Sequence, residues 1–525
     1  MDKIKIDGQS EDSTISLALD TIKIGKQAIV FVNTKRSAEK TAEEIAKCIK
    51  KSDKKLEELS ETVLKALSSP TKQCERLSRC IKKGIAFHHA GLVYKQKELI
   101  ENSFRDKTIK IICATPTLAL GVDLPAFRAI IKDLRRYGHR GMQFIPVLEY
   151  LQMAGRAGRP NYDKEGQAII VAATKPEKDK IHEKYILGEP EDVYSKLAVE
   201  PVLRTYLLSL IAADFINDKE SILGFFERTF WAHQFKDLEK LEEIITRMLA
   251  LLEDWGFLSS TSKSSDFQSG DEYGNEKYKA SIMGKRVAEL YIDPLTAHFF
   301  IECLKKAHNR TEAFSFLQMV SHTLEMRPLL KVRTKEHEKI EEALVSYHGC
   351  ILEAEPSMYE YDEFLSSIKT ALFMQNWIDE KGEEFILEEF NLRPGELHVK
   401  RDNADWLLYA AEELSRILKL KSLISEIIKL RLRLKYGVKE ELLALLKMKN
   451  IGRVRARALF RNKIKDLADV KKADVTKLVQ ILGKKVALDI KKQVGIDIDK
   501  DKVPERKRKG QISLKDWQEK KAIKK

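Results

Sequence analysis

The sequence of 525 residues predicts a multidomain protein of the α/β plus α class. Two patterns support this prediction. Short β-branched runs alternate with helical segments up to about residue 180, and beyond it apolar residues recur at helical spacing. The length is a third observation, because a chain of this size exceeds one hydrophobic core and suggests roughly three or four domains.

Residues 1–180 form the predicted α/β domain. Strands that alternate with helices of 10–15 residues indicate a parallel sheet. Two helical segments are expected in TKRSAEKTAEEIAKCIKK at 34–51 and KQKELIENSFRD at 95–106. The strands are expected in QAIVFVN at 27–33, GIAFHHAGL at 84–92, KIICATPTLALGVDLP at 110–125 (a strand running into a loop), RAIIKDLRRY at 128–137 and GQAIIVAA at 166–173.

The rest of the chain is predicted mainly from helical periodicity. Residues 181–292 form a small helical domain closed by a hairpin-type wing around TSKSSDFQSGDEYGNEKY, and residues 293–437 are almost entirely helical. Residues 438–499 form a last block of short helices interrupted by Gly452 and Gly483. The tail at 500–525 has too little apolar content to fold alone.

The net charge of +14 is concentrated at the C-terminal end. Lys and Arg outnumber Asp and Glu by sixteen to eight from Val438 to Asp499, and by eleven to four from Lys500 to Lys525. Residues 1–437 are therefore close to neutral. A basic end of this kind favours a polyanion as partner, and a merely solvated lysine-rich tail is the alternative.

Hydropathy and cysteine usage indicate a cytoplasmic protein. No run of about 18 apolar residues predicts a membrane span, and the N-terminus MDKIKIDGQSEDS has no apolar signal core. The six cysteines form no CxxC pair, which argues against a disulfide framework and a zinc site. His88 and His89 are adjacent on a predicted strand and point to opposite faces, so no metal site is expected there.

The stretch QMAGRAGRP at 152–160 places Arg156 and Arg159 in a glycine-rich turn. Glycines at 155 and 158 would let the backbone approach a ligand closely. The planar guanidinium fork suits the charge that spreads over phosphate oxygens during phosphoryl transfer. An isolated GRAGR could equally be an ordinary surface turn, so further motifs must decide.

Those motifs are AIVFVNTKRSAEKTAEEIA, FHHAGL, ATPTLALGVDLPA and QMAGRAGRP, and their order and spacing resemble motifs IV, IVa, V and VI of superfamily 2 helicases. The chain most resembles the archaeal Hjm and animal HelQ type of DNA repair helicase, a relative of Ski-type RNA helicases. The resemblance covers essentially the whole chain. It implies a second RecA-like domain at 1–180, a winged helix at 181–292, a helical ratchet domain at 293–437, a helix-hairpin-helix at 438–499, and a basic flexible tail.

The resemblance implies roles for residues around the nucleotide. Arg156 and Arg159 would be arginine fingers on the γ-phosphate, supported by Gln152. Gly121 and Asp123 would lie at the nucleotide cleft and couple it to DNA.

The resemblance also implies a path for DNA. Thr115 would contact the nucleic-acid backbone. Between motifs V and VI a β-hairpin with Arg135 and Arg136 at its base would separate strands, unless it is a plain connection. Trp406 would stack on a base of the translocating strand, with a buried core tryptophan as the alternative.

Two departures from the family pattern occur in this path. The family places a basic residue two turns before the stacking tryptophan, and here Val399 stands there, flanked by Lys400 and Arg401. The hairpin of the helix-hairpin-helix usually holds two glycines, and here Asn450 replaces one. Asn tolerates a left-handed backbone, so the departure is mild. Gly452, Arg453 and Arg455 are the expected phosphate contacts.

The sequence contains no GxxxxGK[ST] loop and no DE-x-H stretch. Helicases of this class bind ATP and Mg²⁺ with those motifs, in a separate first RecA-like domain. The chain is therefore expected to be the C-terminal part of such a helicase, inactive alone and active with the missing half as partner. A tail peptide with Gln511, Leu514 and Trp517 has the spacing of a motif that binds the PCNA sliding clamp.

The function expected from the resemblance is that of the C-terminal half of an ATP-dependent 3′–5′ DNA helicase, nucleoid-associated and acting on branched or stalled-fork DNA. Two rivals stay open. One is a non-catalytic, clamp-tethered DNA-binding accessory protein, which the missing ATP-binding motifs favour. The other is half of a Ski-type RNA helicase, which the helix-hairpin-helix end and the clamp-like tail disfavour.

Overall fold

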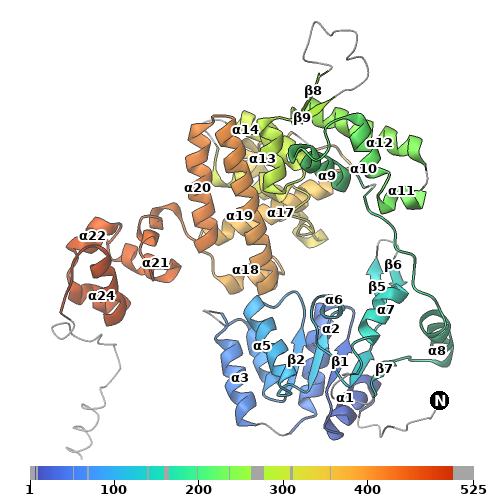
Figure 1. Ribbon diagram of the computed structural model, residues 1–525. Coiled ribbons are helices and arrows are strands. Elements are labelled where there is room, and N and C mark those ends of the chain that lie inside the picture. The colour runs from blue at the N-terminus through green and yellow to red at the C-terminus, as the bar shows by residue number, and fades with distance from the viewer. Residues whose placement is uncertain are drawn as a thin grey trace, which may run out of the picture. The chain divides into compact units, whose positions relative to one another are not determined.

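The computed structural model describes residue 6 and residues 10–50, 53–67, 70–138, 141–158, 165–197, 199–235, 237–261, 277–307, 311–354 and 356–499. The chain forms two compact units. The first is Met1–Ser195 with Leu387–Lys400, and the second is Lys196–Ile386 with Arg401–Lys525. Each unit is coloured along the chain in Figure 1.

A parallel sheet of five strands organises the first unit, in the order β2-β3-β1-β4-β7 (Figure 1). Ala28 of β1 is aligned with Ile111 of β3 on one side and Arg128 of β4 on the other. The predicted parallel α/β arrangement and all five predicted strands are therefore confirmed. The strands are β1 Ala28–Phe31, β2 Ile85–His88, β3 Ile111–Ala114, β4 Arg128–Ile131 and β7 Gln167–Ile170.

Helices pack against this sheet, with α1 against β1 and β4, α2 and α4 against β2, and α7 against β4. No helix is predicted from the sequence between α2 and β2, where the structure has α3 and α4. The stretch TLALG, predicted to lie in a loop, is the short helix α6. The helices are α1 Ser13–Lys23, α2 Lys35–Lys47, α3 Lys54–Leu64, α4 Lys72–Ile81, α5 Tyr94–Arg105, α6 Thr117–Gly121, α7 Val147–Ala154 and α8 Lys175–Ile181.

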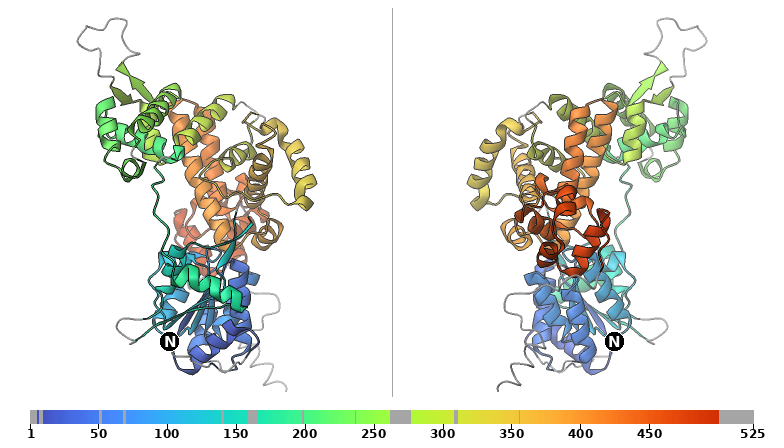
Figure 2. Two further views of the ribbon diagram at one scale, coloured as in Figure 1. Left: turned by 90° about the vertical axis from the view of Figure 1, so that its right-hand side faces the viewer. Right: turned by 90° about the vertical axis from the view of Figure 1, so that its left-hand side faces the viewer.

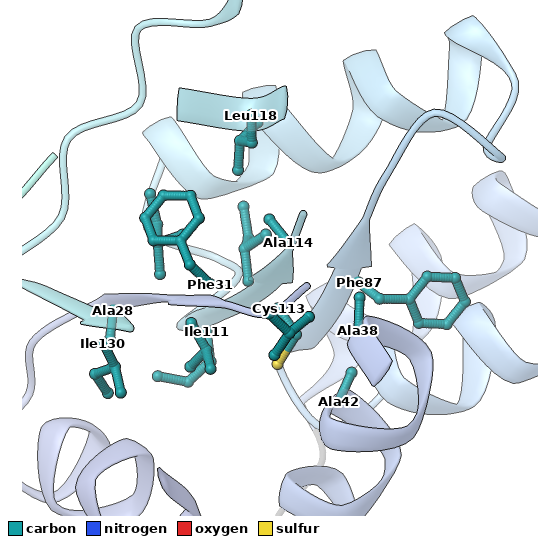
Figure 3. Close-up of a cluster of buried hydrophobic side chains, with 14 of the residues drawn as sticks. Ala28, Phe31, Ala38, Ala42, Phe87, Ile111, Cys113, Ala114, Leu118 and Ile130 are labelled. Atoms are coloured by element: carbon teal, nitrogen blue, oxygen red, sulfur yellow. The ribbon is translucent and has the colours of Figure 1, made fainter. Parts of the chain in front are cut away.

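The core of the first unit lies on both faces of the sheet. Every residue of β1, β2, β3 and β4 is buried, whereas the edge strand β7 is only partly covered. Since successive side chains of a strand point to opposite faces, both faces must be covered. Figure 3 shows Phe31, Ile111 and Ile130 on the central strands and Phe87 beside α2.

The first unit extends past the predicted boundary at residue 180, to Ser195. A π-helical turn, His182–Ile186, follows α8 and returns Tyr185 to the core. The Tyr185 hydroxyl donates to the carbonyl oxygen of Ile145 at 2.7 Å, and the backbone N–H of Val147 donates to Glu191 at 2.8 Å. These contacts attach the segment to the start of α7.

The second unit is mainly helical, as predicted. Strands β8 Leu258–Ser260 and β9 Tyr278–Ala280 pair antiparallel at the predicted wing, and residues 262–276 lie outside the described residues. Arg204 and Asp293 form a buried two-point ion pair at 2.6 and 2.8 Å. The helices are α9 Glu200–Ala212, α10 Lys219–Phe226, α11 Phe230–Phe235, α12 Leu238–Asp254, α13 Ile282–Leu290, α14 Pro294–Lys306, α15 Ala313–Ser321, α16 His337–Tyr347, α17 Tyr361–Ile378 and α20 Lys421–Tyr436, together with the parts of α18 Glu383–Glu389 and α19 Pro394–Ile417 that lie outside Leu387–Lys400.

The C-terminal helices of this unit have an apolar cluster of their own. Buried side chains between Val438 and Ile490 form it. Arg457 attaches this block to the end of α17, because its guanidinium pairs with Glu380 at 2.6 Å and with Glu441 at 2.6 Å. The helices are α21 Arg453–Arg461, α22 Leu467–Lys472, α23 Val475–Leu482 and α24 Lys484–Gln493.

Within the described part of the chain, no helix is both long and apolar enough to cross a membrane. All six cysteines are free thiols.

Replacement of Phe31 by alanine tests the packing of the central strand. Phe31 is fully buried, so we expect Phe31→Ala to lower the free energy of unfolding of the first unit by about 3–5 kcal/mol. Denaturant unfolding followed by circular dichroism measures this change. The exposed Tyr94 is the matched control, and Tyr94→Ala should change stability by less than about 0.5 kcal/mol. Equal losses would contradict the described core.

Candidate functional site

A cavity of about 880 Å³ opens at the carboxyl ends of strands in the first unit. Thr34 and Lys35 follow β1, Thr115 follows β3 and Asp133 follows β4, and all four line the cavity. Parallel strands end at one edge of a sheet, and ligands of open α/β sheets bind outside that edge. The cavity therefore lies where this fold places a functional site.

Three predicted site residues line the cavity: Thr115, Arg136 and Gln152. Thr115 is buried, and its Oγ1 lies 2.9 Å from Oγ1 of Thr117. The two hydroxyls thus form one polar pair at the end of β3. The sequence prediction omitted Thr117, although it stands in the same ATPT motif.

The structure brings Arg156 and Asp123 together, although they come from different motifs. One Arg156 N–H group donates to Asp123 Oδ1 at 3.3 Å, and another donates to the carbonyl oxygen of Ala119 in α6. The Arg156 side chain is 22% exposed, whereas that of Asp123 is 92% exposed. Arg156 is thus held from one side while its ion-pair partner faces solvent.

The two glycines of the turn differ in backbone conformation, and their close approach to a ligand stays a prediction. Gly158 has φ of +92°, which disfavours other residues, whereas Gly155 is an ordinary helical residue. A Cβ on Gly166 would lie 2.3 Å from the backbone nitrogen of Gly158, so two backbone segments meet there. Arg159 lies outside the described residues.

The predicted hairpin between motifs V and VI is present as β5 Arg135–Gly138 and β6 Gly141–Phe144. Arg135 and Arg136 stand at its base, as expected. The Arg135 guanidinium lies 4.4 Å from the centroid of the Phe144 ring, and Arg136 pairs with Glu149 at 2.9 Å. Asn33, after β1, donates to the carbonyl oxygen of Arg135 at 2.9 Å and ties the hairpin to the sheet.

A buried carboxylate, Glu39 of α2, gathers a polar cluster beneath the site. Arg76 lies 2.5 Å from it, Gln73 2.9 Å, Arg393 3.1 Å and His89 3.2 Å. Burial alone raises the pKa of Glu39, but contacts from His89, Gln73 and Arg393 outweigh burial and hold the pKa well below its usual range. Burial also lowers the pKa of His89.

Sequence reasoning missed this cluster. Arg393 lies 354 positions from Glu39, so no local pattern could link the two. The one available signal in the sequence was that the acidic Glu39 stands beside the apolar positions of a predicted helix.

The segment Leu387–Lys400 belongs to the first unit, and its Arg393 contacts Glu39. The backbone N–H of Gly395 donates to the carbonyl oxygen of Gly91 at 3.0 Å, and a Cβ on Gly395 would lie 2.5 Å from the carbonyl oxygen of Leu92. Glu396 forms an ion pair with Lys35, and both residues line the cavity. The first residues of α19 therefore pack against the FHHAGL turn.

Trp406 of α19, the predicted stacking residue, is half-buried and its indole N–H donates to the carbonyl oxygen of Leu290 at 3.0 Å. Of the basic residues next to Val399, Lys400 is buried and Arg401 is partly buried. Burial lowers the pKa of Lys400 to about 8. The Arg401 guanidinium lies 4.7 Å from the centroid of the Trp377 ring, while Val399 itself is exposed.

The predicted helix-hairpin-helix turn has Asn450 with φ of +65°, which confirms its left-handed backbone. Gly452 caps α21. Arg453 donates to the carbonyl oxygen of Lys381 at 2.7 Å and lies 5.3 Å from the Trp377 ring centroid. Arg455 donates to the carbonyl oxygen of Asn450 at 2.6 Å. Contacts of Arg453 and Arg455 with phosphate stay predictions.

His88 and His89 have separate acidic partners, since His88 lies 3.0 Å from Glu101 and His89 lies 3.2 Å from Glu39. Over the described ranges, no group of three or more His, Cys, Asp or Glu side chains could hold a metal ion. The tail residues Gln511, Leu514 and Trp517 lie outside the described residues.

Loss of the Glu39 charge tests the buried cluster. Glu39→Gln removes the carboxylate that Arg393 pairs with, whereas Arg76 keeps Glu43, so we expect stability at neutral pH to fall by about 1–3 kcal/mol. Because the folded-state pKa of Glu39 is depressed, its contribution is fully present above the unfolded pKa and is lost progressively as pH falls from the unfolded pKa towards the folded one. Chemical unfolding of the parent chain and of Glu39→Gln, at neutral and at acidic pH, measures the difference in stability.

The exposed Glu58 of α3 provides the control for this experiment. Glu58→Gln should change stability by less than about 0.5 kcal/mol. A Glu39→Gln effect that persists unchanged at acidic pH would show that the charge is not its cause.

Comparison with known proteins identifies the family. Residues 12–161 match the helicase conserved C-terminal domain, and residues 314–437 match archaeal helicase domain 4. The chain is 37% identical over 513 residues to the ATP-dependent DNA helicase Hel308 of Pyrococcus horikoshii, covering 96% of this chain and 69% of that protein. It is 38% identical over 518 residues to Hel308 of Pyrococcus abyssi, with the same coverage. The similarity extends to Hel308 of Methanococcus vannielii, at 36% over 527 residues, covering 94% of this chain and 69% of that protein. The expected relation to superfamily 2 DNA helicases is therefore confirmed, and the chain belongs to the Hel308 family of ATP-dependent DNA helicases.

Proposed function

We propose that this chain is the C-terminal part of an ATP-dependent 3′–5′ DNA helicase of the Hjm and HelQ type, acting on branched or stalled-fork DNA. In this proposal ATP hydrolysis requires a separate first RecA-like domain. The observation that carries it is the position of Arg156, one turn after Gln152 and held by Asp123 and Ala119. The Arg156–Asp123 pair thus joins motifs V and VI.

The geometry of Arg156 suits contact with a phosphate. A guanidinium has five N–H donors, and Arg156 uses two of its nitrogens on Asp123 and Ala119. The pair with the exposed Asp123 contributes only about 0–1 kcal/mol, so a phosphate can replace it at little cost. In the proposal ATP supplies the phosphoryl group, Arg156 and Arg159 stabilise its developing charge, and Gln152 supports them. Gly121 and Asp123 form the adjoining nucleotide cleft.

The rest of the nucleotide site is proposed to come from the separate domain. The 525 residues contain no GxxxxGK[ST] loop, and the described ones contain no cluster suited to a metal ion. Arginine side chains carry no ligands for Mg²⁺. We therefore propose that the separate domain supplies the residues that hold Mg²⁺ and ATP.

The proposed DNA path uses residues of both units. Thr115 would contact the backbone, the hairpin with Arg135 and Arg136 would separate strands, and Trp406 would stack on a base. Residues 181–292 are proposed as a winged helix and residues 438–499 as a helix-hairpin-helix, whose Gly452, Arg453 and Arg455 approach phosphate. A tail motif of Gln511, Leu514 and Trp517 is proposed to bind a sliding clamp.

We expect DNA-stimulated ATP turnover only when a matching first RecA-like domain from a Hel308 relative is added to the chain. Arg156→Ala should then reduce kcat about 10³-fold or more, because a finger of this kind acts mainly on the transition state. Phosphate release with and without single-stranded DNA measures turnover. The exposed Arg105 of α5 is the control, and Arg105→Ala should leave kcat unchanged.

Lack of turnover in the mixture, with DNA binding intact, would contradict the helicase proposal and favour a non-catalytic accessory protein. Stimulation by RNA but not by DNA would favour the Ski-type alternative.

Trp406 substitutions test base stacking against a structural role. If Trp406 stacks on a base, Trp406→Ala should weaken single-strand binding by about 1–3 kcal/mol at fixed salt, and Trp406→Phe should retain most of the affinity. If only the indole N–H bond to Leu290 matters, the two variants should be equally weak. Fluorescence anisotropy with labelled oligonucleotides distinguishes these results.

A further inference from the structure

An apolar groove in the second unit lies between α16 and α17, away from the residues assigned above. The groove consists of two neighbouring cavities of about 310 and 550 Å³. Both are lined by Glu353, Ala354 and Pro356. The smaller cavity is mostly apolar, since its lining includes Leu344, Ile351, Tyr361 and Phe364. In Figure 2 the golden-yellow helix α16 stands at the margin of this unit.

Large apolar side chains near the groove are exposed. Met358 is 93% exposed and Tyr359 is 99% exposed, and Val345 of α16 is exposed as well. Single exposed apolar residues are ordinary, but several beside an apolar cavity indicate an interaction surface. The groove thus offers buried area to an apolar side chain.

The charge around the groove determines what can bind there. From Glu336 to Glu363 the sequence holds nine Asp and Glu but one Lys, in a protein whose net charge is +14. The exposed Glu338, Glu341, Glu342 and Asp362 have no ion-pair partner among the described residues. Lys306 and Arg327 also line the larger cavity, so it is the exposed carboxylates of α16 and Asp362 that favour a cationic peptide over nucleic-acid phosphates.

The chain carries one segment with the matching chemistry. Residues 500–525 hold eleven Lys and Arg against four Asp and Glu, together with Ile512, Leu514 and Trp517. Leu514 and Trp517 are three positions apart, a spacing that puts both on one face of a helical turn. The segment follows Asp499 of the same unit, and 26 residues can span up to about 85 Å.

We propose that residues 500–525 of this chain dock on the groove beside α16, with Leu514 and Trp517 against the apolar lining and the lysines beside the free carboxylates. Attachment to the same chain gives the peptide an effective concentration of about millimolar, so a weak contact is enough. The docked face is the one proposed to bind a sliding clamp, so the groove and a clamp would compete for it.

Zero-length carbodiimide cross-linking of the full-length chain tests this inference. The reagent joins a carboxylate to a lysine amine with loss of water, so it reports direct neighbours. We expect peptides that link tail lysines to Glu338, Glu341 or Glu342, detected by mass spectrometry at low salt. Leu514→Ala with Trp517→Ala should reduce these links about tenfold, and so should Met358→Ser with Tyr359→Ser, whose exposed positions leave the fold unchanged.

Two controls make the result decisive. Tyr94→Ser, an exposed aromatic residue of the first unit, should leave the links unchanged. Equal linking of the tail to Glu58 and Glu61 of α3 would mean non-specific attraction and would overturn the proposal. A mixture of chains with light and heavy nitrogen separates links within a chain from links between chains. Absence of tail links, or links between chains only, would also overturn it, whether or not the chain supports ATP hydrolysis.

Discussion

The buried Glu39 carboxylate is the interaction on which the arrangement of the first unit most depends. Its partners come from α4, from the turn after β2 and from the distant segment before α19. A charge in such a place is stable only because several cations and N–H donors surround it, and removing one partner leaves another charge uncompensated. The cluster therefore fixes the FHHAGL turn and the first residues of α19 to the same point.

This fixation shapes the cavity at the carboxyl edge of the sheet. Lys35 and Glu396 close part of its wall, and they are positioned by the two elements that meet at Glu39. Gly91 and Gly395 allow the close backbone approach, since a Cβ at either position would collide with neighbouring atoms. A residue of the long helix α19 thus becomes part of a site built on the sheet.

Arginines in this protein have two kinds of ion-pair partner, and the exposure of the partner carboxylate distinguishes them. Arg204, Arg457 and Arg76 satisfy carboxylates between helices and stabilise packing. Arg156 instead pairs with a solvent-exposed carboxylate, which suits the phosphate contact proposed above. The position of a basic residue near a predicted DNA path therefore does not indicate its role. Lys400 is buried, and the Arg401 guanidinium lies over the Trp377 ring.

The sequence by itself determined the five strands and their parallel arrangement, because β-branched runs alternating with helices admit few other folds. It also determined the hairpin with Arg135 and Arg136 and the left-handed turn at Asn450, where local patterns specify local backbone. Only the tertiary structure decided that Asp123 is the partner of Arg156 and that Arg393 reaches Glu39. Such partners lie tens or hundreds of positions apart, and their pairing follows from how whole elements pack rather than from any spacing along the chain.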